Sequence, residues 1–323
     1  MENSAEKVFP LRPVIVFMGT PEFAVSGLEA LIGAGHNVAA VVTQPDRPKG
    51  RGRKRTPSPV KQTALRNGIE VLQPENASEE GFCRRISDKG PDILIVVAFG
   101  QILRRNLLRI PRWGVLNIHA SLLPRYRGAA PIQWAILNNE TRTGLTAMRM
   151  EEGLDTGPIL LQEAVDIPAD ETAGELHDRL ARISGGFLLK TLQGLSENRL
   201  RERPQDHSRA TYAGKIDRKM ARIKWERPAE AVSALIRGLD PWPGAYTTLN
   251  GKEIKLFSSR VVQRTTPGGV PGRVAGLGEG SLLVETGSGI VEIRALQLQG
   301  KKRLPAEVFL RGLPLSTGTL FGS

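Results

Sequence analysis

The sequence predicts an α/β fold in two parts: a domain built on a parallel sheet, followed by a small β-barrel. Its 323 residues exceed the usual size of a domain with one core. Short β-branched runs alternate with helical patterns in the first two-thirds, and closely spaced short strands with Gly-rich turns fill the last third. We therefore expect a tail over residues 1–12, an α/β domain over 13–200, a linker over 201–222 and a barrel domain over 223–323.

The first 42 residues predict a βαβ unit. Residues 14–17 form a β-branched run, and Thr20 followed by Pro21 is typical of a helix N-cap and first helical position. Apolar residues at helical spacing lead to glycines at 33 and 35, where the helix should end, and residues 38–42 form the next strand.

The same alternation continues to residue 195. The predicted helices cover residues 59–67, 78–88, 132–137 and 172–195, and the predicted strands cover 69–72, 93–98, 114–119 and 143–150. Buried strands that alternate with helices indicate a parallel sheet covered on both faces. The first turn lacks the G-x-G-x-x-G spacing, so a nicotinamide dinucleotide is disfavoured.

The last third has a different pattern. Residues 198–222 are polar and charged with few periodic apolar positions, which indicates a linker. A helix over 229–239 and a turn over 240–244 precede predicted strands over residues 252–257, 272–275, 281–285 and 290–298. Such short strands with Gly-rich turns are typical of a small barrel.

Composition argues against several classes of protein. The longest apolar run, residues 93–99, is too short to span a bilayer, and no apolar segment with a cleavage site opens the chain. The single cysteine, Cys83, cannot form an internal disulfide, and no metal-ligand or nucleophile pattern surrounds it. We therefore expect a soluble cytoplasmic monomer that binds no metal and no membrane.

The charge distribution points to a polyanionic partner. The net charge is +12, and residues 211–323 hold 17 Lys and Arg against 9 Asp and Glu. A second concentration, over residues 46–61, has seven basic residues and one acid. Charge runs are usually solvated linkers, but the Pro and Gly punctuation and the lack of helical periodicity here favour phosphate contact.

The densest chemical signal lies in residues 117–131, followed by residues 153–157. Asn117 and His119 are two apart on a predicted strand, so both side chains leave the same face. An amide and an imidazole can together donate to a carbonyl oxygen that becomes a tetrahedral oxyanion. Asp155 could orient the imidazole and favour its charged form, or accept a proton from an attacking amine through water.

Each piece taken alone also has an ordinary structural explanation. A lone strand histidine is more often structural than catalytic, and an aspartate between glycines is usually a turn or cap. Residues 121–124 could be a loop leaving a strand, with Arg125 and Arg127 in a surface turn. The remaining histidines have no such neighbours and are expected to be structural: His36, His177 and His207.

In order and spacing, the motifs N-x-H-x-S-L-L-P-x-x-R-G and G-x-D-T-G resemble the signature of formyltransferases that use 10-formyltetrahydrofolate. The resemblance implies that Asn117, His119 and Asp155 form the catalytic trio. It also leads us to expect folate contacts from the following loop and from the backbone at the end of the preceding strand: Ser121, Leu122, Leu123 and Pro124, with Val97, Phe99 and Gly100.

From about residue 14 to residue 311 the chain resembles the methionyl-tRNA formyltransferase family. This implies a Rossmann-like catalytic domain, an OB-like barrel that helps hold RNA, and methionyl initiator tRNA as the formyl acceptor. In the family the loop corresponding to residues 44–61 enters the acceptor-stem end. The RNA contacts that we expect are Arg47, Arg51, Arg53, Lys54, Lys215, Lys301, Lys302 and Arg303.

Two alternatives remain open from the sequence. A formyltransferase with the same trio could act on a small amine, such as a nucleotide or an amino sugar, because the trio does not discriminate. A non-catalytic RNA-binding protein on the same scaffold would account for the basic barrel, but the intact Asn117, His119 and Asp155 argue against it.

Overall fold

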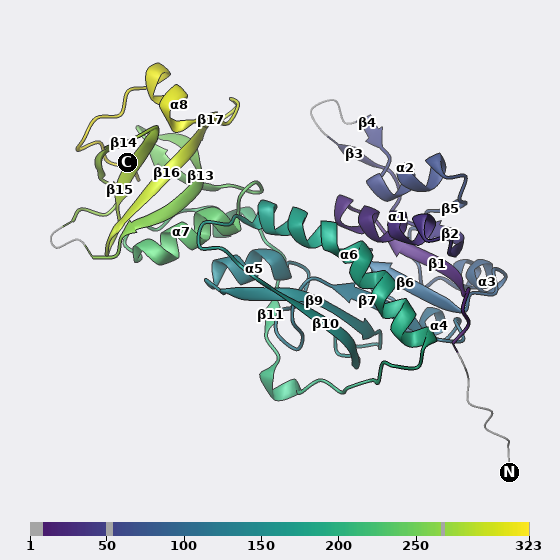
Figure 1. Ribbon diagram of the computed structural model, residues 1–323. Helices are drawn as coiled ribbons and strands as arrows, with labels where there is room; N and C mark the ends of the chain where they lie inside the picture. The colour runs from purple at the N-terminus through teal and green to yellow at the C-terminus, as the bar shows by residue number, and fades with distance from the viewer. Residues whose placement is uncertain (1–8, 50–53, 266–268, 323) are drawn as a thin grey trace, which may run out of the picture. The chain divides into compact units, whose positions relative to one another are not determined.

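The computed structural model describes residues 9–49, 54–265 and 269–322, which form two compact units (Figure 1). The first unit combines the chain up to residue 128 with residues 144–165 and 177–212. The second combines residues 129–143, 166–176 and 213–323. The linear domain limits expected from the sequence, 13–200 and 223–323, stay a prediction.

A seven-stranded sheet forms the centre of the first unit, in the order β10-β9-β7-β6-β1-β2-β5. Its strands are β1 (Val14–Gly19), β2 (Asn37–Val42), β5 (Val71–Leu72), β6 (Ile93–Val97), β7 (Val115–His119), β9 (Arg142–Arg149) and β10 (Ile159–Asp166). The strands from β7 to β5 are parallel, as predicted. The prediction was wrong for β9, which runs antiparallel to β7. An apolar run indicates that a strand is buried. It does not indicate the direction in which that strand runs in the sheet.

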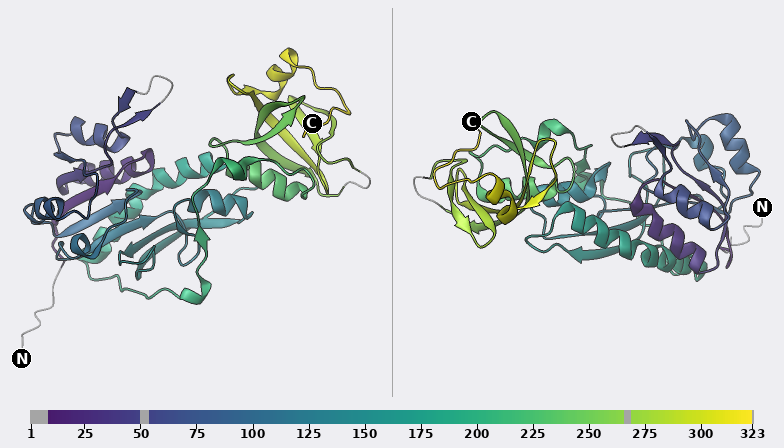
Figure 2. Two further views of the ribbon diagram at one scale, coloured as in Figure 1. Left: turned by 180° about the vertical axis from the view of Figure 1, so that it is seen from behind. Right: turned by 90° about the horizontal axis from the view of Figure 1, so that it is seen from above.

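Helices cover both faces of this sheet. They are α1 (Val25–Gly33), α2 (Pro59–Arg66), α3 (Glu80–Ser87), α4 (Arg105–Leu108) and the long α6 (Ala173–Ser196). Val16 and Met18 of β1 pack in one buried cluster with residues of α3 and α4. Side chains of β1 alternate between faces, and Phe17 lies on the other face beside Gly27 of α1. There α1 and α6 lie side by side (Figure 2).

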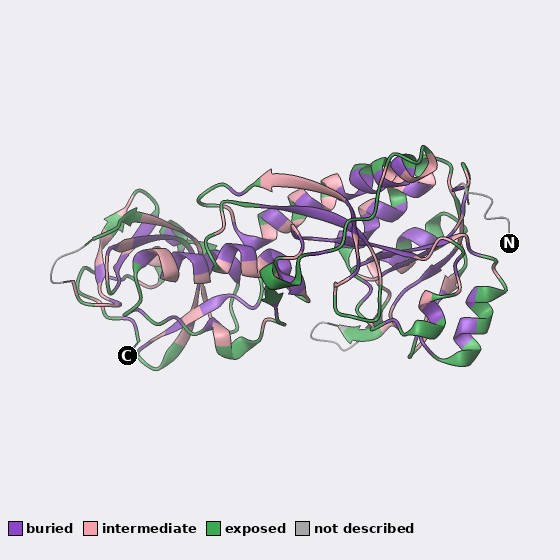
Figure 3. Ribbon diagram, turned by 90° about the horizontal axis from the view of Figure 1, so that it is seen from below, coloured by how far each residue is buried: buried purple, intermediate pink, exposed green. Residues whose placement is uncertain are grey.

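Buried residues follow the central strands and the inward sides of the helices (Figure 3). Thr172 and Glu175 start α6 with a capping box, in which the Thr172 hydroxyl accepts from the Glu175 N–H at 3.2 Å and the Glu175 carboxylate accepts from the Thr172 N–H at 2.8 Å. None of the helices in the described ranges has both the length and the apolar character that crossing a membrane requires.

The first helix begins later than its sequence pattern predicts. A 3₁₀ turn, η1 (Glu22–Ala24), comes between Pro21 and α1, and Pro21 occupies its cap position. Thr20 does not cap the helix, because its hydroxyl donates to the backbone oxygen of Phe99 at 2.9 Å. A tertiary hydrogen bond has thus replaced the local one.

The basic segment expected as an irregular loop contains a short hairpin, β3 (Arg47–Lys49) paired antiparallel with β4 (Lys54–Thr56). Lys61 stabilises the start of this hairpin, since its ammonium donates to Asp46 and to Gln73, both at 2.7 Å. Arg51 and Arg53 lie outside the described residues, as does the side chain of Lys54.

The second unit contains an antiparallel sheet, in the order β12-β13-β16-β15-β14, with β17 paired to β16. Its strands are β12 (Ala245–Leu249), β13 (Lys252–Gln263), β14 (Val274–Gly278), β15 (Ser281–Glu285), β16 (Ile290–Leu298) and β17 (Leu304–Pro305). Its helices are α5 (Pro131–Leu137), α7 (Ala229–Gly238) and α8 (Ala306–Gly312). The remaining short elements of the chain are β8 (Arg127–Gly128), β11 (Tyr212–Ala213), η2 (His207–Arg209) and η3 (Arg218–Ala221).

Residues 321 and 322 form hydrogen bonds near both edges of this sheet, at β14 and at β12. The N–H of Phe321 donates to the Gly272 oxygen at 2.9 Å beside β14, and the N–H of Gly322 donates to the Thr248 oxygen of β12 at 2.8 Å. This segment therefore connects the two edges, as a barrel would require. The assignment as OB-like stays a prediction.

One ion pair of this unit predicts a pH-dependent stability. Arg273 donates to both carboxylate oxygens of Glu285 at 2.9 Å, and the N–H of Val270 donates to the same group at 2.7 Å. The Arg273 hydrogen bonds lower the pKa of Glu285, although burial opposes them. A lowered folded-state pKa stabilises the protein above the unfolded-state pKa, and this contribution is lost as the pH falls. Glu285→Gln should therefore destabilise the protein by on the order of 1 kcal/mol at pH 7.

In thermal unfolding measured from pH 7 to pH 3, the difference between Glu285→Gln and the wild type should shrink below about pH 4.3. Glu230→Gln is a matched control, because Glu230 also pairs with an arginine, Arg264, but the two side chains are more exposed, at 35% and 77%. A constant difference across this pH range would contradict the assignment of the pair.

Candidate active site

The structure brings Asn117 and His119 together at the carboxyl end of β7. They alternate with Ile118 in an extended strand, so both side chains leave one face. Asn117 is 8% exposed and His119 is 7% exposed. Within the described part of the chain, the Asn117 side-chain amide makes no hydrogen bond. A buried amide without a protein partner is available to a ligand oxygen.

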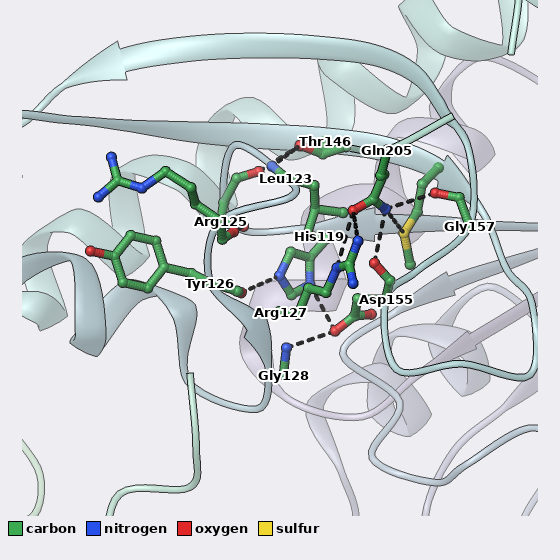
Figure 4. A network of polar contacts seen from close by, with 12 residues as sticks. His119, Leu123, Arg125, Tyr126, Arg127, Gly128, Thr146, Asp155, Gly157 and Gln205 are labelled. Atoms are coloured by element: carbon green, nitrogen blue, oxygen red, sulfur yellow. Dashed lines mark hydrogen bonds and ion pairs between the residues drawn. The ribbon is translucent and has the colours of Figure 1, made fainter. Parts of the chain in front are cut away.

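His119 has a polar neighbour at each ring nitrogen (Figure 4). Its Nε2 lies 2.9 Å from the backbone oxygen of Tyr126, and a carbonyl only accepts, so Nε2 carries the hydrogen. Nδ1 lies 3.8 Å from the Asp155 carboxylate. Nδ1 is therefore the nitrogen at which a proton can be gained or lost beside Asp155.

Asp155 reaches the site from the loop between β9 and β10. Its carboxylate accepts from the Gly128 N–H at 2.8 Å with the same oxygen that faces His119. The residue has a φ of +53°, in the left-handed region that an aspartate tolerates better than most side chains. The prediction that Asn117, His119 and Asp155 converge is consistent with this geometry.

The sequence did not reveal Gln205, which fixes the Asp155 loop (Figure 4). Its amide nitrogen donates to the backbone oxygens of Asp155 and Gly157 at 2.8 and 2.7 Å. Its oxygen accepts from Nε and Nη2 of Arg127 at 3.1 and 2.7 Å. Gln205 is 6% exposed and lies inside the polar stretch interpreted as linker, where no pattern marked it.

Arg127 was open to interpretation as a surface residue, but it is 2% exposed. Besides Gln205, its guanidinium contacts Nδ1 of His207 at 3.2 Å. Arg127 thus joins β8 to residues that follow α6. Its neighbour Gly128 supplies the N–H that holds the Asp155 carboxylate.

Comparison with known proteins identifies the family. Residues 12–192 match the family model described as formyl transferase, and residues 215–314 match formyl transferase, C-terminal domain. The methionyl-tRNA formyltransferase of Pelobacter propionicus is 50% identical over 308 residues, covering 95% of this chain and 96% of that protein. That of Moorella thermoacetica is 46% identical over 308 residues, covering 95% and 99%.

The chain belongs to the methionyl-tRNA formyltransferase family.

Solved structures agree on the fold of this formyltransferase. WlaRD, a sugar 3N-formyl transferase solved in the presence of dTDP and 5-N-formyl-THF, superimposes with a TM-score of 0.66 at 20% identity, covering 91% of this chain and all of that chain. HypX from Aquifex aeolicus, in complex with tetrahydrofolic acid, gives 0.63 at 17% identity, covering 93% and 47%. Formyltransferases of this family use 10-formyltetrahydrofolate as co-substrate.

The loop after β7, predicted to hold the folate, has a defined shape in this formyltransferase. The Thr146 hydroxyl donates to the Ser121 oxygen at 2.6 Å and accepts from the Leu123 N–H at 3.2 Å. Gln162 donates to the Leu123 oxygen at 2.9 Å. Ser121 and Leu123 are buried, whereas Leu122 and Pro124 are partly exposed. The protein itself therefore satisfies the Leu123 N–H and the Ser121 and Leu123 oxygens.

The other folate residues that we predicted differ in their surroundings. Val97 is buried at the end of β6, and Phe99 is buried in the core cluster that contains α3 and α4. The Phe99 oxygen is already engaged by Thr20 and by Gln44. Gly100 is exposed and has a φ of +86°, so the backbone there can adopt a turn that a side chain would strain.

The predicted RNA-contacting residues are mostly exposed. Arg47, Lys215, Lys301 and Lys302 all lie on the surface. Arg303 is exposed too, but its guanidinium donates to both oxygens of the buried Asp240 at 2.7 and 3.1 Å and lies over the Phe257 ring at 4.3 Å. The structure therefore engages Arg303 within the protein. Among the described residues, no group of three or more His, Cys, Asp and Glu could hold a metal ion.

The glycines that flank Asp155 predict different effects of substitution. A Cβ at Gly157 would lie 1.9 Å from the backbone oxygen of Arg149, so the backbone must move. A Cβ at Gly153 would meet the Thr156 hydroxyl at 2.2 Å, and this side chain can rotate. Gly157→Ala should therefore cost about 1–3 kcal/mol in unfolding free energy and should also lower the turnover number.

Gly153→Ala is the matched control and should have the smaller effect on both quantities. Denaturant unfolding and steady-state kinetics measure them. Equal effects of the two substitutions would show that the contact with Arg149 does not decide the position of the Asp155 loop.

Proposed function

We propose that this protein transfers the formyl group of 10-formyltetrahydrofolate to the free amino group of methionyl initiator tRNA. The observation that carries the proposal is the convergence of a free, buried amide, Asn117, with the His119 and Asp155 pair. Whole-chain identity of 46–50% to proteins named methionyl-tRNA formyltransferase supports the same conclusion.

Asn117 donates a hydrogen bond to the formyl oxygen as that oxygen gains negative charge. The amide is already buried and has no competing partner in the described chain, so little reorganisation is needed. Once it is protonated at Nδ1, His119 also stabilises this oxygen, because it then places positive charge on the same strand face. The bound 10-formyltetrahydrofolate supplies the formyl carbon, and Asn117 fits this group because a carbonyl oxygen matches an unpartnered amide donor.

The pair of His119 and Asp155 handles the proton that leaves the attacking amine. Because Tyr126 fixes the hydrogen on Nε2, Nδ1 is the basic nitrogen, and the Asp155 carboxylate stabilises the charge once Nδ1 is protonated. The Gly128 N–H holds that carboxylate in place. The loop over residues 121–124 holds the pterin, together with backbone near Val97, Phe99 and Gly100.

Two groups of basic residues bind phosphates of the tRNA. The first lies in the basic segment and consists of Arg47, Arg51, Arg53 and Lys54, and the second consists of Lys215, Lys301, Lys302 and Arg303. These side chains position the RNA without reading bases. The double variant Lys301→Gln/Lys302→Gln should weaken tRNA binding and reduce the magnitude of the log–log salt slope by about 2. Filter binding at several salt concentrations measures this, and an unchanged slope would remove these lysines from the interface.

We also propose that the protein is a cytoplasmic monomer with domains over residues 13–200 and 223–323. The polar stretch between them, residues 201–222, carries Gln205 and His207 into the site. Sedimentation equilibrium measures the mass in solution directly. A dimer near micromolar concentration would contradict the monomer.

The function is tested by formylation with 10-formyltetrahydrofolate and three acceptors: charged initiator tRNA, charged elongator tRNA and small amines. We expect fast transfer to the initiator tRNA and little to the other two. Transfer only to an amino sugar or a nucleotide would show that the proposed acceptor is wrong and that the proposed formyl transfer is right. RNA binding without any transfer would favour a non-catalytic protein.

A further inference from the structure

A hollow of about 350 Å³ opens on the second compact unit. Three adjacent strands form its floor, β12, β13 and β16, of which β13 and β16 are labelled in Figure 1. Tyr246, Lys255 and Gln297 lie directly opposite one another across these strands. Ile254 and Leu256, on either side of Lys255, are fully buried in the core. The row therefore lies on the outer face of the sheet.

Trp242 stands at one side of the hollow with 68% of its surface exposed. The turn that carries it is fixed, because Lys255 donates to the Pro243 oxygen at 2.6 Å. A single exposed apolar residue needs no explanation, but an exposed indole beside a polar hollow presents a flat surface to a ligand. Trp242 can therefore accept a planar group without rearrangement of the turn.

Arg218 lines the same hollow from η3. Its guanidinium lies 6.0 Å from the Tyr246 ring centre and donates to the Glu253 carboxylate at 2.7 Å. Both partners project from the sheet floor and orient the guanidinium over the hollow, although the Arg218 side chain is 68% exposed. An ordered guanidinium is a second flat, cationic surface for stacking.

The charge around the hollow favours a polyanion. Exposed cations on its lining segments or next to them outnumber the acids, which are Asp217 and Glu253. The cations are Arg218, Lys219, Lys252, Lys301 and Lys302. Aromatic rings on a sheet face, surrounded by cations, are the usual means of binding single-stranded nucleic acid, since bases stack and phosphates are neutralised. Gln299, also in the lining, offers an amide that can bond to a base edge.

We propose that this hollow binds the base of an unpaired nucleotide, stacked on Trp242, while the surrounding lysines and Arg218 hold the adjacent phosphates. Where the RNA is the tRNA substrate, the inference rests on the proposed function. It adds a contact with an unpaired base to an interface otherwise described by phosphate contacts alone.

The test uses the full chain and two labelled RNA probes of equal length, a ten-nucleotide oligoadenylate and a duplex. Fluorescence anisotropy measures the affinity of Trp242→Ala, Trp242→Phe and the control Leu277→Ala, whose side chain is also exposed on this sheet. Trp242→Ala should weaken single-strand binding by about 5-fold to 150-fold, and Trp242→Phe should retain most of it. The duplex should bind all four proteins alike, because its bases are paired.

Wild-type affinity of Trp242→Ala for the single strand would overturn the site, as would an equal loss in Trp242→Phe and Trp242→Ala. Equal weakening of single strand and duplex would also overturn it. A formylation assay on the wild type separates the two proposals. If the wild type formylates charged tRNA but Trp242→Ala binds the single strand normally, the proposed function stands and the proposed base site is wrong. If single-strand binding depends on Trp242 but no tRNA is formylated, the base site stands and the proposed function is wrong.

Discussion

Asn117→Ala is expected to lower the turnover number by about a hundred-fold, because it removes a preorganised donor from the oxygen that gains charge. The affinity for tRNA should stay within a factor of about 2, since the predicted phosphate contacts lie on other segments. The side chain is buried but has no hydrogen-bond partner in the described chain, so its removal leaves no protein group unsatisfied. The thermal midpoint should therefore change little.

Single-turnover formylation at saturating tRNA and folate measures this loss directly. Asn67→Ala is a matched control, because Asn67 is exposed at the end of α2 and its side-chain amide, within the described part of the chain, donates only to the Thr63 oxygen. Asn117→Asp should not restore activity, since a carboxylate has no hydrogen to donate. A turnover number of Asn117→Ala within about threefold of the wild type would exclude Asn117 as the donor.

Substitutions at Gln205 are expected to separate activity from stability. Gln205→Glu keeps an acceptor for the buried Arg127 guanidinium but loses both donors to the Asp155 and Gly157 oxygens. Turnover should fall by about tenfold or more, because a small displacement of a catalytic group is costly. Gln205→Leu should be equally slow and less stable by about 3 kcal/mol, since Arg127 then keeps only its contact with His207.

Both quantities are needed, namely kcat from steady-state kinetics and the free energy of unfolding from urea titration. Gln62→Glu serves as the control, because Gln62 is exposed and its side-chain amide, among the residues that the structure describes, bonds only to the Pro57 oxygen. If kcat followed stability through both variants, Gln205 would be a purely structural residue. A fully active Gln205→Glu would remove its positioning role.

Local patterns predicted most of the first unit. The strands β1 and β6 have β-branched apolar runs that suit only a buried sheet, and α6 has a capping box at Thr172 and Glu175. The strands β10 and β12 and the helix α8 escaped prediction. In β10 exposed and buried positions do not alternate cleanly, and in β12 short runs of threonine carry little apolar signal.

For the site, the motif spacing predicted the three residues that converge, since Asn117 and His119 share a strand and Asp155 follows between two glycines. It could not predict Gln205. A glutamine has no periodic signal, and it lies 50 residues from the loop that it holds. It becomes recognisable only when the chain after α6 returns to bury its amide against Asp155 and Arg127.

By itself, the sequence determined the family and most of the longer strands and helices, and it predicted Asn117, His119 and Asp155 as the catalytic residues, because these depend on side-chain chemistry and on spacing along one or two elements. Only the tertiary structure decided the direction of β9, the burial of Arg127, the engagement of Arg303 by Asp240 and the hydrogen on Nε2 of His119. For the first three the partner is far away in the chain, and for the last it is the Tyr126 oxygen, which the loop after β7 brings back to His119. Burial then makes a hydrogen bond or an ion pair with that partner necessary.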